Sequence, residues 1–89
     1  MQIDDACRHD VTNRLRRVQG QIAGVLAMVE EGRDCADIVT QVAAASKALD
    51  RAGLRIVVDG MHQCAAASER GEQPPIEAAK LERMFLSLS

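Results

Sequence analysis

The chain has 89 residues, 47% of them hydrophobic, yet it holds a single Phe and no Trp or Tyr. A chain of this length builds one small domain with a thin core, so we expect one domain over residues 1–89 that gains stability by oligomerising. The net charge of −2 argues against a generic nucleic-acid binder. Neither a basic-plus-apolar leader nor an apolar run of about 18 residues occurs, and the three cysteines are odd in number, which predicts a cytoplasmic protein without a membrane partner.

The first element is an amphipathic helix that ends near Gly32. Asp4 and Asp5 are candidate N-caps, and Gly32 suits the position after a helix C-terminus. Apolar residues recur at helical spacing: Val11, Leu15, Val18, Ile22, Val25, Leu26 and Val29.

The second element is a long helix from Asp34, its N-cap, to about Ser68. Gly53 and Gly60 lie inside it, and each costs about 1 kcal/mol relative to Ala. Asp59-Gly60 could instead form a turn that splits the helix. We favour one helix because the apolar spacing continues through Val57, Met61 and Cys64.

The Gly- and Pro-containing stretch 71–75 ends the long helix, and a short third helix is expected over residues 76–85. No β-type alternation competes with this pattern. The fold class is therefore all-α with three helices, and no helix-turn-helix signal is present.

Two cysteines share one face of the long helix. Cys64 follows Cys35 after about eight whole turns, at a distance of about 43 Å along the axis. A disulfide needs Cα atoms within about 7 Å, and one metal ion is similarly short-range. If the thiols act together, two chains must run antiparallel, so that Cys35 of one meets Cys64 of the other. Alternatively both are space-filling core residues, although a helix N-terminus favours a reactive thiolate at Cys35.

Basic residues form a second candidate site. The first helix presents Arg14 and Arg17 on one face, with Gln21, and the second presents Lys47, Arg51 and Arg55. Such ridges would attract DNA phosphates, although solvated faces of amphipathic helices look the same. No phosphate loop, catalytic triad or paired-carboxylate pattern occurs, so we do not expect an enzyme.

The remaining candidate ligands are weaker. Cys7 and His9 are read as a mobile thiol and imidazole near the N-terminus, or as residues without a function. Met61 could offer a thioether but is more typical of a core, and His62 projects away from Cys64. Gly20 and Gly24 either permit close helix contact or are merely tolerated.

The chain resembles the copper-sensing repressor family (CsoR, RcnR, FrmR and CstR types). The resemblance lies in three segments, Arg14–Gln21, Cys35–Gln41 and Leu49–Leu54, and covers nearly the whole chain. It implies an antiparallel helical dimer that doubles to a flat homotetramer and represses transcription until its effector arrives. By position, Arg14 and Arg51 match basic residues used against DNA, and Cys35 and Cys64 match the two sensing thiols.

The chain departs from the metal sensors of this family at two positions. The copper sensors have a histidine four residues before the second cysteine, where this chain has Gly60, and the nickel and cobalt sensors use an N-terminal ligand where this chain has Ile3. The sequence therefore resembles the persulfide-sensing branch most, and no cofactor is required.

Three hypotheses follow. The first is a repressor of double-stranded operator DNA, released when reactive sulfur species modify Cys35 and Cys64. The second is a Cu(I)-responsive repressor that uses the same thiols, with Met61 or Cys7 as a candidate further ligand. The third is a helical interaction protein that binds no DNA.

Overall fold

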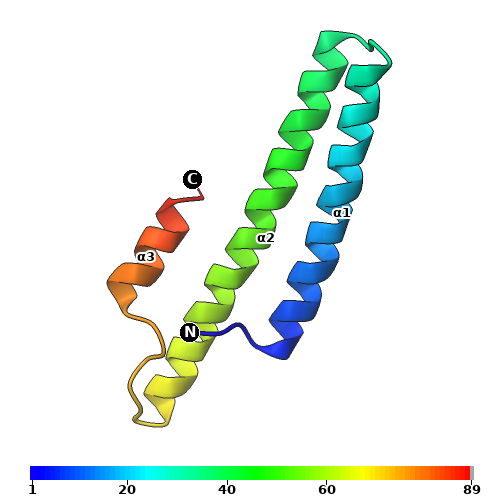
Figure 1. Ribbon diagram of the computed structural model, residues 1–89. Helices are drawn as coiled ribbons and strands as arrows, with labels where there is room; N and C mark the ends of the chain where they lie inside the picture. The colour runs from blue at the N-terminus through cyan, green and yellow to red at the C-terminus, as the bar shows by residue number, and fades with distance from the viewer. Residues whose placement is uncertain (89) are drawn as a thin grey trace.

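The structure, a computed structural model, describes residues 1–88 and confirms the all-α fold (Figure 1). Helix α1 spans Asp5–Glu30, α2 spans Cys35–Glu69 and α3 spans Ala78–Leu86. The first two form an antiparallel hairpin, and α3 turns back along the C-terminal half of α2, so that α2 is the central element. The three helices make a flat, elongated layer of 58 × 24 × 13 Å.

The helix ends follow the capping residues of the sequence. The Asp4 side chain accepts a hydrogen bond of 2.7 Å from the Cys7 amide at the start of α1. The Asp34 side chain accepts one of 3.1 Å from the Ala36 amide at the start of α2. Between them Gly32 has φ +71°, a left-handed conformation that suits glycine and ends α1 as expected.

The long helix α2 is continuous, so Asp59-Gly60 does not split it. Its two internal glycines serve as the contact points of α3. A Cβ on Gly53 would lie 2.9 Å from Leu88 Cδ2, and a Cβ on Gly60 would lie 2.9 Å from Leu81 Cδ1. These glycines lower the helix propensity of α2 but let the leucines of the α3 segment approach its backbone.

The third helix starts two residues later than expected, at Ala78. Ile76 lies in the preceding turn instead and is buried. Glu77 is extended, at φ −67° and ψ 141°, and is the N-cap residue of α3 without a side-chain hydrogen bond to the helix. Among residues 1–88, no helix combines the length and the hydropathy that crossing a bilayer requires.

One chain cannot cover its own apolar surface. The accessible surface is 6420 Å², whereas a compact chain of this mass exposes about 5,100 Å². The radius of gyration is 17.0 Å, against about 12 Å for a compact domain of this length. The half of the hairpin near the α1–α2 turn leaves large apolar side chains exposed on both helices: Ile22, Leu26, Val29, Val39, Val42 and Leu49.

Candidate functional site

The two cysteines of α2 lie near opposite ends of the helix. Cys35 is its first residue and is exposed, and Cys64 is half-buried. The Cys64 thiol donates a hydrogen bond of 3.6 Å to the carbonyl oxygen of Ile76, in the turn that leads to α3. A single chain therefore does not join these thiols, and residues 1–88 hold no group of three His, Cys, Asp or Glu side chains that could bind a metal ion.

Gly60 lies one turn before Cys64, and the space beside it is already filled. A Cβ at this position would meet Leu81 Cδ1 at 2.9 Å and Met1 Sδ at 3.4 Å. An Ala at position 60 would require Leu81 to shift, and a longer side chain would also meet Met1. At this position the resemblance to copper sensors implies a histidine. The chain has a glycine instead, and Leu81 and Met1 lie beside it.

Cys7 is not a mobile thiol, so that expectation was wrong. It lies in the first turns of α1, fully buried, and its thiol donates to the carbonyl oxygen of Arg55 at 3.8 Å. Burial, and after it the charge of Asp59, raises the pKa of the Cys7 thiol above its usual value. A buried thiol that stays protonated is a structural residue, and Cys7 is set aside as a ligand.

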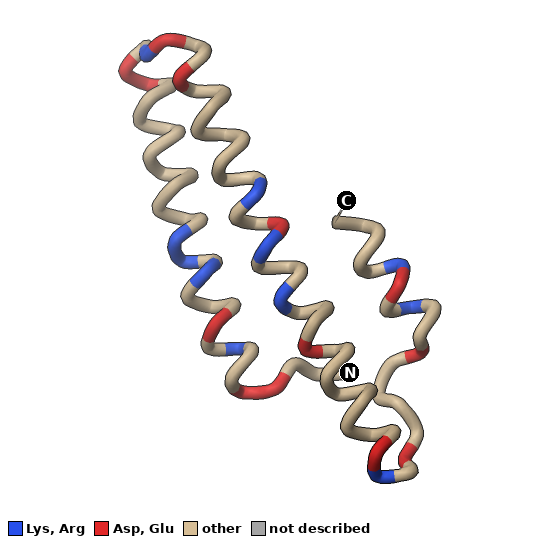
Figure 2. The backbone as a smooth tube through the Cα atoms, turned by 180° about the vertical axis from the view of Figure 1, so that it is seen from behind, with Lys and Arg blue, Asp and Glu red and all other residues tan. Residues whose placement is uncertain are grey.

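The basic candidates come together in the middle of the hairpin (Figure 2). Arg14 and Arg17 of α1 and Arg51 of α2 line one shallow hollow, with Gln21 and Ala48 between them. Lys47 is exposed one turn before Arg51. Among residues 1–88, Arg17, Lys47 and Arg51 have no carboxylate within ion-pair distance, so their charges are free to meet phosphates.

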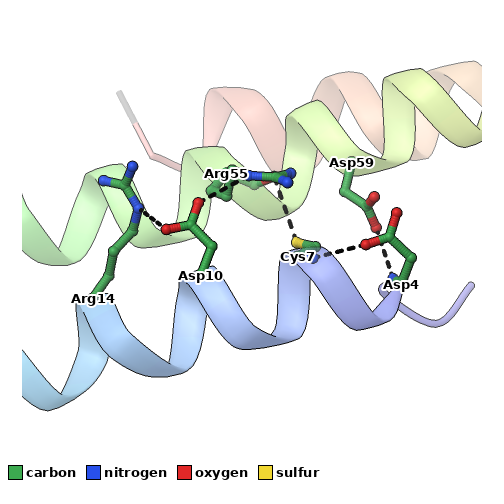
Figure 3. Close-up of polar contacts among 6 residues, drawn as sticks. All are labelled: Asp4, Cys7, Asp10, Arg14, Arg55 and Asp59. Atoms are coloured by element: carbon green, nitrogen blue, oxygen red, sulfur yellow. Dashed lines mark hydrogen bonds and ion pairs between the residues drawn. The ribbon is translucent and has the colours of Figure 1, made fainter.

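Arg55 does not continue the exposed ridge of Lys47 and Arg51, as the spacing had suggested. Its Nε donates to Asp10 Oδ2 at 3.1 Å, and the other oxygen of Asp10 accepts from Arg14 Nε at 3.0 Å (Figure 3). Burial alone would raise the pKa of Asp10, but Arg14 and Arg55 outweigh it and lower this pKa below its usual value. Asp10 thus joins the two helices and orients Arg14 at the rim of the basic hollow.

Asp59, considered from the sequence only as part of a possible turn, is instead a buried carboxylate that is 1% exposed. Its Oδ2 accepts from the Asp4 amide at 3.1 Å and from Gln63 Nε2 at 2.8 Å. The pKa of Asp4 is lowered, first by its bond from the Cys7 amide and then by the neighbouring Asp59 carboxyl (Figure 3). One signal was available, because Asp59 follows Ala45 and Ala52 at intervals of seven on the buried face of α2.

Comparison with known proteins places this geometry in a family. A family model described as a metal-sensitive transcriptional repressor matches residues 8–86. The copper-sensing transcriptional repressor CsoR of Bacillus subtilis is 36% identical over 81 residues, which cover 88% of this chain and 80% of that protein. The copper-sensing transcriptional repressor RicR of Mycobacterium tuberculosis is 35% identical over 57 residues, which cover 64% of this chain and 59% of that protein.

A third relative carries no functional name. The uncharacterized protein YrkD of Bacillus subtilis is 46% identical over 46 residues, which cover 51% of this chain and 73% of that protein. No solved structure matches the chain. The extent of the family match, together with a thiol at each end of α2 and a basic hollow midway along the hairpin, shows that the chain belongs to the family of metal-sensitive transcriptional repressors, which are not enzymes.

Proposed function

We propose that this protein is a Cu(I)-responsive repressor that binds operator DNA as a homotetramer and releases it when Cu(I) joins Cys35 of one subunit to Cys64 of another. The observation that carries the proposal is the placement of two thiols on one helix, too far apart to meet within a chain. The copper-sensing relatives support Cu(I) as the effector. Effector and assembly are thus proposed together.

The donor chemistry suits Cu(I). Thiolates are soft ligands, and soft ligands select Cu(I) over divalent first-row ions that prefer nitrogen and oxygen donors. Zn(II), Ni(II) and Co(II) would need further ligands, and position 60 offers none. On binding, Cu(I) would replace the thiol protons of the half-buried Cys64 and the exposed Cys35, and these protons would be released to water.

The exposed apolar surface supports an assembly of several chains. The side chains left uncovered on α1 and α2 include Ile22, Leu26 and Leu49, which are 55%, 57% and 50% exposed. A monomeric protein rarely exposes so continuous an apolar face. A second copy running antiparallel would cover this face and would bring its Cys35 toward Cys64.

The basic hollow supports DNA as the partner. Three arginines from two helices face the same side, and the strongly acidic turn between α1 and α2 lies far from them (Figure 2). In a symmetric oligomer each contact is repeated in every copy, so a modest hollow per chain becomes an extended basic surface. The family assignment favours this reading over the interaction protein without DNA binding.

A second candidate effector is a reactive sulfur species, and Gly60 favours it because the third copper ligand is absent. The Cys35 thiolate would attack a polysulfide and take one sulfur, while the shortened polysulfide leaves. The Cys64 thiolate of the partner would then attack the Cys35 sulfur and displace hydrosulfide, which leaves a disulfide between subunits. The polysulfide is the oxidant, and the two thiols are oxidised.

One experiment compares the two effectors. Fluorescence anisotropy follows the release of labelled DNA, taken from the region upstream of the gene, as Cu(I) or sodium tetrasulfide is added anaerobically. We expect release at about one Cu(I) per chain, and none from Cys35→Ala or Cys64→Ala. Cys7→Ser serves as a thiol control outside the site and should respond like the wild type. Release by tetrasulfide alone would replace Cu(I) with sulfur, and absence of DNA binding would refute the repressor.

A further inference from the structure

The first four residues are fixed along α2 on either side of Gly60. The Asp4 amide donates to Asp59 Oδ2 at 3.1 Å, and Gln63 Nε2 donates to the carbonyl oxygen of Gln2 at 2.9 Å. Asp59 and Gln63 belong to the same turn of α2 as Gly60. The N-terminal segment is therefore held by a buried carboxylate and a side-chain amide, directly over this turn.

This placement brings the Met1 thioether to the notch that Gly60 leaves open. Met1 Sδ lies 3.4 Å, and Met1 Cε 3.5 Å, from the point that a Cβ on Gly60 would occupy. Cys64 lies one turn further along the same helix, and Cβ positions four residues apart on a helix are about 5–6 Å from each other. The sulfur of Met1 thus lies within van der Waals distance of the place where a side chain of residue 60 would start, one helical turn from Cys64.

We propose that Met1 Sδ is a third ligand of the Cu(I) site, beside Cys64 and Cys35 of the partner subunit, and this rests on the proposed function. A thioether is a soft, neutral donor that Cu(I) accepts and Zn(II) or Ni(II) do not favour. Two thiolates and one thioether make a three-coordinate site that is more selective for Cu(I) than a site with an imidazole. Gly60 then has a function, because a side chain longer than that of Ala would compete with Met1 for this space.

The surroundings of Met1 favour such a ligand. Met1 lines a cavity of about 440 Å³ together with the apolar side chains of Ile3, Ile56 and Ile76. Glu77 and Lys80 also line this cavity and Met1 is 40% exposed, so only the apolar part of the lining limits the access of water, which competes with a weak thioether ligand for the metal ion. Two other methionines are rivals: Met84 lines the same cavity, and Met61 is three residues before Cys64 but 55% exposed.

The test replaces Met1 with leucine. Each chain is released from a cleavable fusion that leaves one extra Gly before position 1, which is either Met or Leu. Met1→Leu conserves volume and should leave helicity and thermal unfolding nearly unchanged. Cu(I) affinity, measured by competition with a chromogenic chelator, should fall at least about tenfold, the lower limit for losing even an outer-shell partner of a metal. Met61→Leu and Met84→Leu are matched controls and should keep their affinity.

X-ray absorption gives a readout that does not depend on DNA. The copper edge should indicate three sulfur-type ligands in the Met1 chain and two in the Leu variant. In a chain with Met28, Met61 and Met84 replaced by Leu and Met1 as selenomethionine, copper should show a selenium neighbour.

The outcomes separate this inference from the proposed function. If Cu(I) binds and releases DNA but is two-coordinate, has no selenium neighbour and binds the Leu variant equally well, the Met1 ligand is refuted and the repressor stands. If affinity falls for Met61→Leu or Met84→Leu instead, the wrong thioether has been named. If the two cysteines bind no Cu(I), both proposals fail.

Discussion

At the scale of single residues, the arginines of the basic hollow differ in whether a carboxylate pairs with them. Arg14 is held by Asp10, whereas Arg17 and Arg51 line the same hollow with no carboxylate partner within residues 1–88. Arg16 is adjacent to Arg17 in sequence but lines a different hollow on the side of Leu15 and Ile22. This pair of neighbours offers a matched test of which face meets DNA.

We expect Arg17→Ala and Arg51→Ala to weaken DNA binding and to make its salt dependence shallower, because each removes one phosphate contact per chain. Arg16→Ala removes the same charge from another face and should change affinity much less. Anisotropy titrations at several salt concentrations measure both the affinity and the slope. Equal losses for Arg16→Ala and Arg17→Ala would mean that net charge alone, and not the hollow, determines binding.

Asp10 should make the stability of the fold depend on pH. Its folded-state pKa is lowered, so its contribution is present above the unfolded value of about 3.9 and is lost as pH falls through the folded value. Asp10→Asn should therefore lower Tm most above about pH 5, with a difference from the wild type that shrinks in acid. Thermal melts followed by circular dichroism from neutral to acid pH measure this difference.

Asp5→Asn is the control for this prediction, because Asp5 also pairs with an arginine, Arg8, at 3.0 Å, but its side chain is 95% exposed. Such exposed pairs contribute about 0–1 kcal/mol, so the variant should melt like the wild type at each pH. A Tm deficit of Asp10→Asn that stays constant into acid would contradict the linkage.

At the scale of elements, α2 is shaped by its glycines. Ala in place of Gly gains about 1 kcal/mol in a helix interior, and Gly20 and Gly24 of α1 have no atom within 4 Å of an added Cβ. Gly60 differs, since its Cβ would lie 2.9 Å from Leu81 Cδ1. The two kinds of glycine look alike in the sequence but not in the structure.

We expect Gly60→Ala to gain less stability than Gly20→Ala, because Leu81 must shift to make room. Repeating Gly60→Ala in a Leu81→Ala background should recover the difference, since the obstructing side chain is gone. Urea unfolding of the four chains of this cycle gives the coupling. A coupling indistinguishable from zero would show that α3 does not dock on Gly60.

Helix number and helix ends could be predicted from the sequence because they depend on local chemistry: Asp4 and Asp34 as caps, Gly32 after α1 and the apolar spacing of α2. The contacts between the helices could not be predicted from the sequence, because they join segments that are distant along the chain. The contacts of Met1 with Gly60, of Asp59 with Asp4 and of Arg55 with Asp10 join residues that are about 45 to 60 positions apart. Arg55 continues the i, i+4 spacing of Lys47 and Arg51 along α2. It points toward α1 because Asp10 of α1 accepts a hydrogen bond from it.

At the scale of the whole molecule, the flat layer of three helices leaves an apolar face that the proposed tetramer would cover. Leu26 is 57% exposed, so a charge there would be harmless in a monomer. In a tetramer that covers this face, Leu26→Glu would bury an unpaired carboxylate in every copy. We expect light scattering at micromolar concentration to show a tetramer for the wild type and for Gln73→Glu, an exposed control, and smaller species for Leu26→Glu.

A stable wild-type monomer would contradict both the assembly and the shared thiol site. The basic hollows would then act singly, and the apolar face would need another occupant. The cysteine pair is the part of the account that depends on the assembly most directly.

The most direct test mixes two inactive chains, Cys35→Ala and Cys64→Ala. Each alone lacks one thiol in every site, so neither should release DNA when Cu(I) is added. After the two are unfolded together and refolded, mixed dimers contain one complete site, formed by Cys64 of the first chain and Cys35 of the second. The account predicts that anisotropy then shows Cu(I)-dependent release of DNA from the mixture. A mixture as unresponsive as its two parents, or a parent that responds alone, would contradict a site shared between subunits.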